Sequence, residues 1–126
     1  MVQPAPAIKH TGIQRILKAA GYSFKGLSYA FRKEAACRQE ALASFILLPL
    51  AFWLNVSHVE RILLVMAIVL VLVVELLNTG IEAVVDRVGV EYHLLAGAAK
   101  DVGSAAVLLS LLLCVYVWVS ILLTVF

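Results

Sequence analysis

The sequence contains few cysteines, few prolines and little charge. Its 126 residues include two cysteines and three prolines, and charged residues make up 14% of the chain. Cys37 and Cys114 are too few and too far apart for a disulfide framework, so we expect two free thiols. The low charge content excludes an ordinary soluble domain, in which about a quarter of the residues are charged.

Apolar residues are abundant instead. Hydrophobic residues make up 63% of the chain, and its mean hydropathy is +1.03. This composition indicates an integral membrane protein. The first strongly apolar stretch begins about forty residues into the chain, so we expect no cleavable signal peptide.

The basic residues are concentrated near the start of the chain. Residues 1–40 hold seven of the ten basic residues and two acids, whereas residues 41–126 hold three basic residues and six acids. A basic N-terminal arm predicts contact with anionic lipid headgroups or phosphate ligands. Nucleic acid is not expected as a partner, because this arm leads directly into the membrane.

Residues 1–33 predict a flexible leader followed by an amphipathic helix. Pro4 and Pro6 indicate a leader at 1–10, and Thr11 to Gln14 fit the capping-box pattern of a helix start. Apolar residues then recur at helical spacing, with basic residues on the other faces. We therefore expect a helix at 11–33 that lies in the membrane interface.

The rest of the chain predicts three transmembrane helices, at 41–59, 62–85 and 102–126. A turn is expected near 55–61 and a loop at 90–99, and Trp53 and Trp118 are interpreted as interface aromatics. The fold class is therefore an all-α membrane protein with a single membrane domain, 1–126. The positive-inside rule predicts a cytoplasmic N-terminus and a C-terminus on the far side of the membrane.

A polar face interrupts the second predicted span. Glu75, Asn78, Glu82 and Asp86 recur at offsets of 3, 7 and 11 residues, which places them on one face of a helix. Carboxylates are costly inside a bilayer, so this face predicts a functional site. The alternative is a polar seam that only joins helices, but such seams usually employ Ser, Thr or Asn.

These residue types suit phosphoryl transfer. That chemistry needs oxygen ligands for Mg²⁺, a cation for the phosphates and a base for the attacking hydroxyl. Glu34 and Glu82 are the metal candidates, and Lys100, next to Asp101, is the candidate phosphate cation. Glu75, which lies deeper in the apolar span, is the candidate base.

Three blocks of sequence resemble the prokaryotic diacylglycerol kinase family, a family of small integral-membrane lipid kinases. They read RILKAAGYSFKG at 15–26, EAACRQE at 34–40, and ELLNTGIEAVVDR at 75–87, which continues with EYH at 91–93 and AKDVGSAA at 99–106. The resemblance covers nearly the whole chain beyond the leader.

The resemblance implies transfer of the ATP γ-phosphate to diacylglycerol, with phosphatidic acid as product, by a homotrimer with shared active sites in the bacterial inner membrane. By motif position, Glu75 corresponds to the catalytic base, and Glu34 and Glu82 to the Mg²⁺ ligands. Nucleotide contacts correspond to Arg15, Tyr22, Glu34, Glu82, Glu91, Tyr92, His93, Lys100 and Asp101. Lipid-site positions correspond to Arg15, Ala19, Ala20, Gly21, Tyr22, Ser23, Phe24, Ser28, Phe31, Ala36, Arg38, Glu40, Trp53, Asn55, Arg61, Glu75, Asn78 and Ser104.

The chain departs from the family pattern at three positions. Gly80 stands where alanine is usual, Cys37 where an aromatic residue is common, and Ala98 where a basic residue is common. Cys37 and Ala98 bear on lipid preference and nucleotide affinity rather than on the reaction.

The sequence leaves two alternative functions. The undecaprenol kinases are a branch of the same family, but the EAACRQE block is more similar to the branch that phosphorylates diacylglycerol. A small proton-coupled transporter could use Glu75 as a carboxylate relay. That function gives no reason for Glu34, Lys100 and Asp101 to accompany it.

Overall fold

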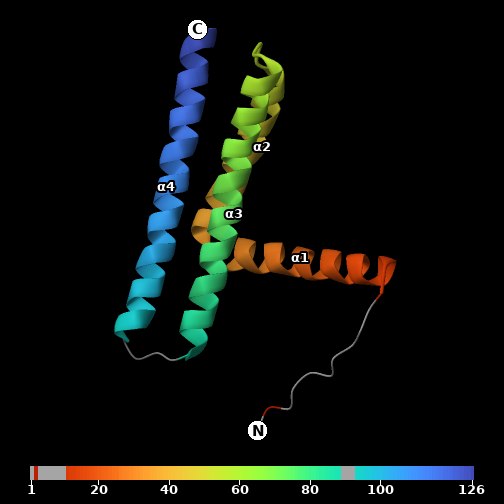
Figure 1. Ribbon diagram of the computed structural model, residues 1–126, viewed down its shortest axis with the longest axis vertical. Helices are drawn as coiled ribbons and strands as arrows, with labels where there is room; N and C mark the ends of the chain where they lie inside the picture. The colour runs from red at the N-terminus through yellow and green to blue at the C-terminus, as the bar shows by residue number, and fades with distance from the viewer. Residues whose placement is uncertain (1, 3–10, 89–92) are drawn as a thin grey trace.

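The computed structural model describes Val2 and residues 11–88 and 93–126, and these residues form four helices. Three of the helices run alongside one another, whereas α1 projects crosswise from them (Figure 1). The all-α fold expected from the sequence is confirmed. The helices are α1 (Ile13–Lys33), α2 (Ala35–Trp53), α3 (His58–Val88) and α4 (Leu94–Val125).

The helices α2, α3 and α4 are each long and apolar enough to cross a membrane. With 19 residues, α2 is about 28 Å long, close to the thickness of the hydrocarbon core of a bilayer. With 31 and 32 residues, α3 and α4 are each well over 40 Å long. Their joined ends therefore extend past the level of α1, as Figure 1 shows.

The first span was predicted wrongly at both ends. The prediction was 41–59, but α2 begins at Ala35 and ends at Trp53. The helix continues through the polar residues Arg38, Gln39 and Glu40, which are not part of the apolar stretch that predicted the span. At Leu54 the backbone becomes extended, with φ −62° and ψ 143°. Hydropathy thus located the span but not its helix ends.

A capping box begins α3 at His58 rather than at the expected residue 62. The Ser57 backbone N–H donates to Glu60 Oε1 at 3.0 Å, and the Glu60 N–H donates to Ser57 Oγ at 3.1 Å. This reciprocal pair satisfies two backbone donors at the helix start. The Ser-x-x-Glu signal was present in the sequence, where we interpreted these residues as part of a turn.

The last helix also begins earlier than expected, at Leu94 instead of residue 102. The predicted loop at 90–99 is therefore wrong from Leu94 onward, while residues 89–92 lie outside the described part of the chain. The side chain of His93 caps α4, because its Nδ1 accepts from the Leu95 backbone N–H at 3.1 Å.

The first helix begins at Ile13, and its expected cap at Thr11 is wrong. Gly12 is the N-cap, with φ 58° and ψ −126°, and no side chain of the described residues caps the helix. A positive φ costs glycine little, which explains this residue at the helix start.

Apolar side chains of α1 such as Ile16 and Phe24 are exposed. The placement of α1 in a membrane interface stays a prediction, and the leader at 1–10 lies outside the described residues apart from Val2.

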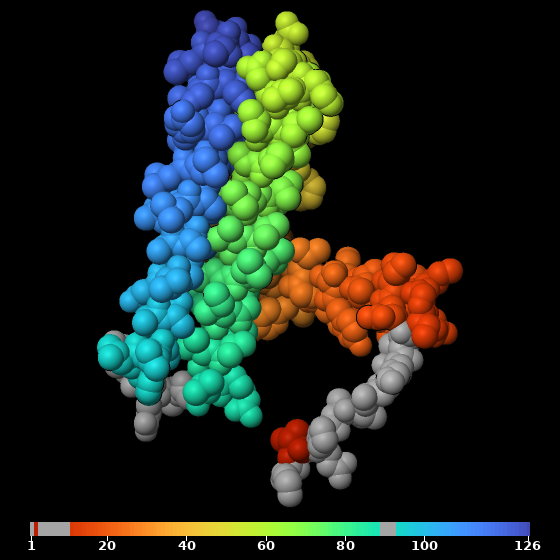
Figure 2. All heavy atoms as spheres, viewed as in Figure 1, coloured from red at the N-terminus to blue at the C-terminus, as the bar shows by residue number. Residues whose placement is uncertain are grey.

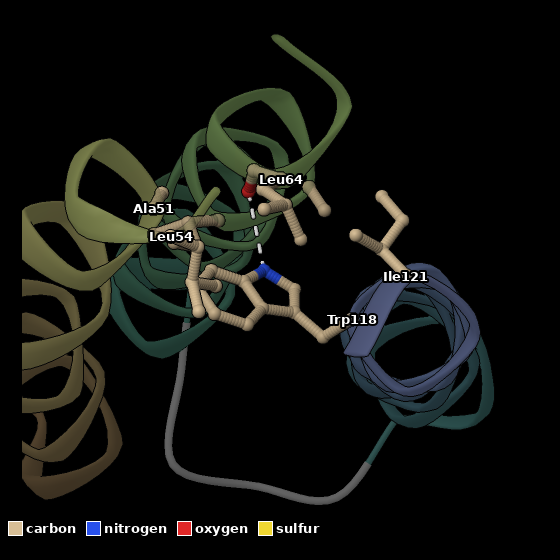
Figure 3. Close-up of a cluster of buried hydrophobic side chains, with 7 residues drawn as sticks. Ala51, Leu54, Leu64, Trp118 and Ile121 are labelled. Carbon is tan, nitrogen blue, oxygen red and sulfur yellow. Dashed lines mark hydrogen bonds between the residues drawn. The ribbon is translucent and has the colours of Figure 1, made fainter. Parts of the chain in front are cut away.

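The hydrophobic core lies near the turn between α2 and α3. Its buried side chains come from α2, α3, α4 and the residue that follows α2, and they include Ala51, Leu54, Leu64, Trp118 and Ile121 (Figure 3). The Trp118 indole N–H donates to the Leu64 backbone carbonyl at 3.2 Å, so α4 is joined to α3 by a hydrogen bond as well as by packing. The interpretation of Trp118 as an interface aromatic is wrong, because it is 6% exposed.

Candidate active site

The polar face of α3 changes from buried to exposed along the helix. Glu75 and Asn78 are 4% and 9% exposed, Glu82 is half-buried, and Asp86 is exposed. Asn78 Nδ2 donates to Glu82 Oε1 at 3.4 Å, so these two residues share a face as the spacing predicted. The arrangement links a water-shielded carboxyl group to the accessible end of the helix.

A second carboxyl group, that of Glu40 on α2, neighbours the carboxyl group of Glu75. The Glu40 Oε2 atom is buried and has no hydrogen-bond partner among the described residues. An unpaired buried polar atom costs about 1–3 kcal/mol, so such atoms are uncommon without a ligand to meet them. The family resemblance implied a lipid contact at Glu40. The position of Glu40 opposite Glu75 is a finding of the structure, because it depends on how α2 packs against α3.

Asn78 carries the other unpaired atom of this site. Its Oδ1 is buried and has no hydrogen-bond partner within the described residues. The side chain lies directly against Gly103 of α4, where an added Cβ would overlap Oδ1 and come within 3.3 Å of Cγ. Glycine at position 103 therefore lets α4 approach the amide.

Glu34 lies at the joint between α1 and α2, at the level of Glu82. It is the C-cap of α1 and the N-cap of α2, with φ −113° and ψ 119°. A hydrogen bond to the Glu82 carboxyl group, burial and the neighbouring negative charges of Glu82, Glu75 and Asp86 raise the pKa of Glu34. The two carboxyl groups are thus close together, and a cation between them would relieve their repulsion.

The Glu34 and Glu82 pair fits a site for Mg²⁺, since both residues offer hard carboxylate oxygens. Within the described residues no group of three His, Cys, Asp or Glu residues could hold a metal ion. The remaining ligands would have to be phosphate or water oxygens, which is how Mg²⁺ is usually bound when it accompanies a nucleotide.

Lys100, the predicted phosphate cation, forms an ion pair with Asp86. Its Nζ lies 2.7 Å from Asp86 Oδ1 and joins the first turns of α4 to the end of α3. The pair is largely exposed, so it contributes little stability and its partners can exchange readily. We predicted Asp86 on this face but not its partner. Asp101 is exposed beside Lys100.

The predicted contacts on α1 border two cavities. A cavity of about 430 Å³ lies between α1 and α3, and a second of about 370 Å³ lies between α1, α2 and α3. Ser23 lines the first, and Phe24, Ser28 and Phe31 line the second, together with the buried Cys37. Gly26 lines the first cavity, and Leu27 lines both. The other predicted residues on and beside α1 line neither cavity and are exposed: Arg15, Ala19, Ala20, Gly21, Tyr22 and Ala36.

Three predicted lipid contacts lie at the other end of α3. Trp53 and Asn55 are in or beside the α2–α3 turn, and Arg61 is about 21 Å along the helix from Glu75. The guanidinium of Arg61 donates to the carbonyls of Ala51 at 3.2 Å and Leu54 at 3.1 Å. The structure thus does not bring these residues to the acidic site.

The remaining predicted residues are at the edge of the site or outside the described residues. His93 is exposed at the start of α4, and Ser104 is exposed on α4. Glu91 and Tyr92 lie outside the described residues. Cys37 and Cys114 are free, as expected.

The fold and the site define a helical membrane protein with carboxyl groups gathered where α1, α2 and α3 meet. The model of the prokaryotic diacylglycerol kinase family matches residues 21–122. The chain therefore belongs to this family and is an enzyme. This confirms the resemblance seen in its sequence.

Curated relatives agree over nearly the whole chain. A diacylglycerol kinase of Escherichia coli (strain K12) is 54% identical over 108 residues, which cover 86% of this chain and 88% of the relative. A diacylglycerol kinase of Pseudomonas aeruginosa is 49% identical over 122 residues, covering 97% of this chain and 99% of the relative. One from Haemophilus influenzae is 44% identical over 114 residues, covering 90% of this chain and 97% of the relative.

Proposed function

We propose that this enzyme transfers the γ-phosphate of ATP to the free hydroxyl of diacylglycerol, with Mg²⁺ as cofactor, and produces phosphatidic acid. The observation that carries the proposal is the order of carboxyl groups along α3. Glu75 is buried beside Glu40, and Glu82 lies about 10 Å further toward the exposed end, beside Glu34. A lipid hydroxyl and a water-soluble nucleotide can meet between these two pairs.

Glu75 acts as the general base in this mechanism. Its carboxylate accepts the proton of the lipid hydroxyl as the oxygen attacks the γ-phosphorus, and the bond to the departing ADP breaks. Burial keeps water, a competing nucleophile, away from this position. The unpaired Asn78 Oδ1 is available to accept a hydrogen bond from the lipid.

The phosphate side of the site employs Glu34, Glu82 and Lys100. Glu34 and Glu82 would hold Mg²⁺, which when bound neutralises charge on the transferred phosphoryl group. Lys100 binds the phosphates after its ammonium group exchanges Asp86 for them. The exposure of the Lys100–Asp86 pair supports this exchange.

We place the enzyme in the bacterial inner membrane with its acidic site at the cytoplasmic face. The basic residues of 1–40 support a cytoplasmic N-terminus, and the three spans then place the C-terminus in the periplasm. In this orientation α1 lies in the interface, with side chains such as Ile16 and Phe24 in the lipid. ATP reaches the exposed ends of α3 and α4 from the cytoplasm.

The enzyme acts as a homotrimer with shared active sites. Three thin helices cannot enclose a site alone, and most of α1 extends away from the other helices (Figure 2), so a neighbouring protomer is needed to complete the walls of the site. Two inactive variants, one changed at Arg15 and one at Glu75, should therefore regain partial activity when they are co-assembled. Verified mixed trimers that stay inactive would contradict shared sites.

Phosphorylation by the purified protein in mixed micelles tests the reaction. With Mg²⁺ and labelled ATP we expect labelled phosphatidic acid from diacylglycerol and little product from undecaprenol. The names of the relatives support the first lipid. A strong preference for undecaprenol would overturn the choice of substrate, and no lipid product from either would overturn the reaction.

A further inference from the structure

Arg38 joins the end of α1 to the beginning of α2. It lies in the first turn of α2, and its Nη1 donates to the carbonyls of Phe31 and Arg32, at 3.1 Å each. These carbonyls belong to the last turn of α1, where backbone acceptors lack partners within the helix. One guanidinium therefore satisfies two acceptors across the joint.

The joint itself is a single residue, Glu34. The Glu34 backbone N–H donates to the Ala30 carbonyl at 2.9 Å, and its own carbonyl accepts from the Arg38 N–H at 3.2 Å. Arg38 thus holds both sides of the joint, the α2 side through its backbone and the α1 side through its side chain. The angle of the joint decides where the Glu34 carboxyl group points.

Few other contacts fix the direction of α1. Among the described residues of this helix only Ala30 is buried. Figure 2 shows most of α1 extending away from the other helices as an arm. Without a tie at its C-terminal end, α1 would swing about Glu34 and move the carboxyl group away from Glu82.

We propose that Arg38 is a positioning residue that clamps the last turn of α1 to α2 and thereby holds Glu34 facing Glu82. Arg38 then sets the Mg²⁺ dependence of the kinase without touching metal, nucleotide or lipid. The resemblance implied a lipid contact at this position, whereas the guanidinium is directed at protein backbone. The inference rests on the proposed metal role of Glu34 and Glu82.

Three variants separate the clamp from a simple charge effect. Arg38→Gln removes the two bonds, and Arg38→Lys keeps the charge but lacks the planar fork. Arg32→Gln is the matched control, since it removes the same charge from the same region. Among the described residues, the Arg32 side chain donates within α1 alone, to the Ser28 carbonyl at 3.3 Å.

The first readout is the Mg²⁺ concentration for half-maximal rate in the micelle assay. Loss of an outer-shell partner weakens metal sites by roughly 10- to 100-fold, so for Arg38→Gln we expect an increase of about tenfold. The rate at saturating Mg²⁺ should fall much less. Arg38→Lys should lie between Arg38→Gln and the unchanged protein, and Arg32→Gln should match the unchanged protein.

The second readout is the distance between spin labels on exposed positions of α1 and α2, Lys25 and Phe45. Labels are attached to cysteines introduced there after Cys37 and Cys114 are replaced by alanine. Labelled chain is diluted with an excess of unlabelled chain, so distances within one chain dominate. Arg38→Gln should broaden the distribution, whereas the Arg32→Gln control should leave it unchanged.

The outcomes are distinct. An unchanged Mg²⁺ dependence in Arg38→Gln, or a raised KM for diacylglycerol alone, would overturn the inference even when Glu34→Gln shifts the Mg²⁺ dependence. If Glu34→Gln also leaves the Mg²⁺ dependence unchanged, the proposed metal role of Glu34 is wrong. The distances between the spin labels then test the clamp on their own, and an unchanged distribution in Arg38→Gln would overturn it. Where Arg38→Gln does not fold, Arg38→Lys carries the same two measurements and the same criteria.

Discussion

The polar groups near the α2–α3 turn and those around Glu75 differ in whether they have hydrogen-bond partners. Near the α2–α3 turn, the Ser57–Glu60 pair caps α3. Arg61 donates to two backbone carbonyls at the C-terminal end of α2, and Trp118 donates to the carbonyl of Leu64. At the other end, Oε2 of Glu40 and Oδ1 of Asn78 are buried without partners within the described chain. Near the α2–α3 turn the protein itself pairs these polar groups. Around Glu75 it leaves two buried acceptors for something else, although Lys100 and Asp86 pair with each other further along, at the exposed end of α3.

The contrast separates stability from function. Polar groups that are paired within the protein stabilise a fold, whereas buried groups without partners destabilise it and persist where a ligand meets them. Both kinds of polar group occur on α3, so being polar within an apolar helix is not enough to identify the site. Substitutions at the paired end should change mainly stability, and those at the unpaired end should change mainly activity.

The largest expected effect is that of Glu75→Gln. The amide keeps the shape of the side chain but cannot accept the proton, so turnover should fall by roughly 10²- to 10⁴-fold with little change in nucleotide binding. Glu60→Gln is the matched control on α3, because glutamine also serves in a capping box. Turnover in micelles and nucleotide binding measure the two effects. Near-normal turnover in Glu75→Gln would rule out the base.

Gly103→Ala should have the next largest effect. The added Cβ would overlap Asn78 Oδ1, and overpacking of this kind costs about 1–3 kcal/mol. We expect lower stability in denaturant titrations together with lower activity, since the displaced amide lies beside Glu75. The control is Gly80→Ala, whose Cβ meets open space and which should be neutral or stabilising, by up to about 1 kcal/mol. Equal effects of the two variants would contradict the close approach of α4 to Asn78.

Trp118→Phe should have a smaller effect, and on stability alone. It retains most of the buried ring but removes the indole donor to Leu64, a loss of about 0.5–1.5 kcal/mol. Trp53→Phe, at a site that is 77% exposed, should change the free energy of unfolding by less than about 0.5 kcal/mol. Both are measured by denaturant titration and micelle assay. A large loss of specific activity in Trp118→Phe would contradict the claim that substitutions near the α2–α3 turn change mainly stability.

The smallest expected effect is a pH dependence of stability due to Glu34. Its pKa is raised in the folded state, so the folded state binds this proton more tightly than the unfolded state. The favourable contribution is present at low pH and is lost as the pH rises through the raised pKa. Without Mg²⁺, Glu34→Gln should therefore become more stable relative to the unchanged protein as pH increases, in unfolding titrations at several pH values. Added Mg²⁺ should reduce the difference in free energy of unfolding between Glu34→Gln and the unchanged protein at neutral pH. A difference that depends on neither pH nor Mg²⁺ would contradict the pairing of Glu34 with Glu82.

Features of a single helix could be predicted from the sequence. The spacing of Asn78 and Glu82 was enough to place them on one face, because helical periodicity is local. The start of α3 could also be predicted from the capping-box pattern of Ser57 and Glu60. We placed it at residue 62 instead, where the apolar run begins. The start of α2 could not be predicted from hydropathy, because residues 38–40 are polar and hydropathy marks the apolar part of a span rather than the end of its helix.

Features that join two helices could not be predicted in this way. The proximity of Glu40 to Glu75 and the Lys100–Asp86 pair depend on how α2 and α4 pack against α3. Arg61 shows the same limit, because only the fold reveals that its partners are backbone carbonyls of α2. Trp118 was assigned to an interface because a membrane-end tryptophan usually lies there, and its real partner is a carbonyl 54 residues away.

The different surroundings of the two tryptophans give the protein a built-in optical probe. Trp118 is buried and hydrogen-bonded between α3 and α4, whereas Trp53 is exposed at the end of α2. Their fluorescence should therefore separate into a component shielded from aqueous quenchers and a component open to its environment. With Trp53→Phe the emission comes from Trp118 alone. A rise in its quenching would then report the separation of α4 from α3 in an unlabelled protein, during unfolding or during turnover.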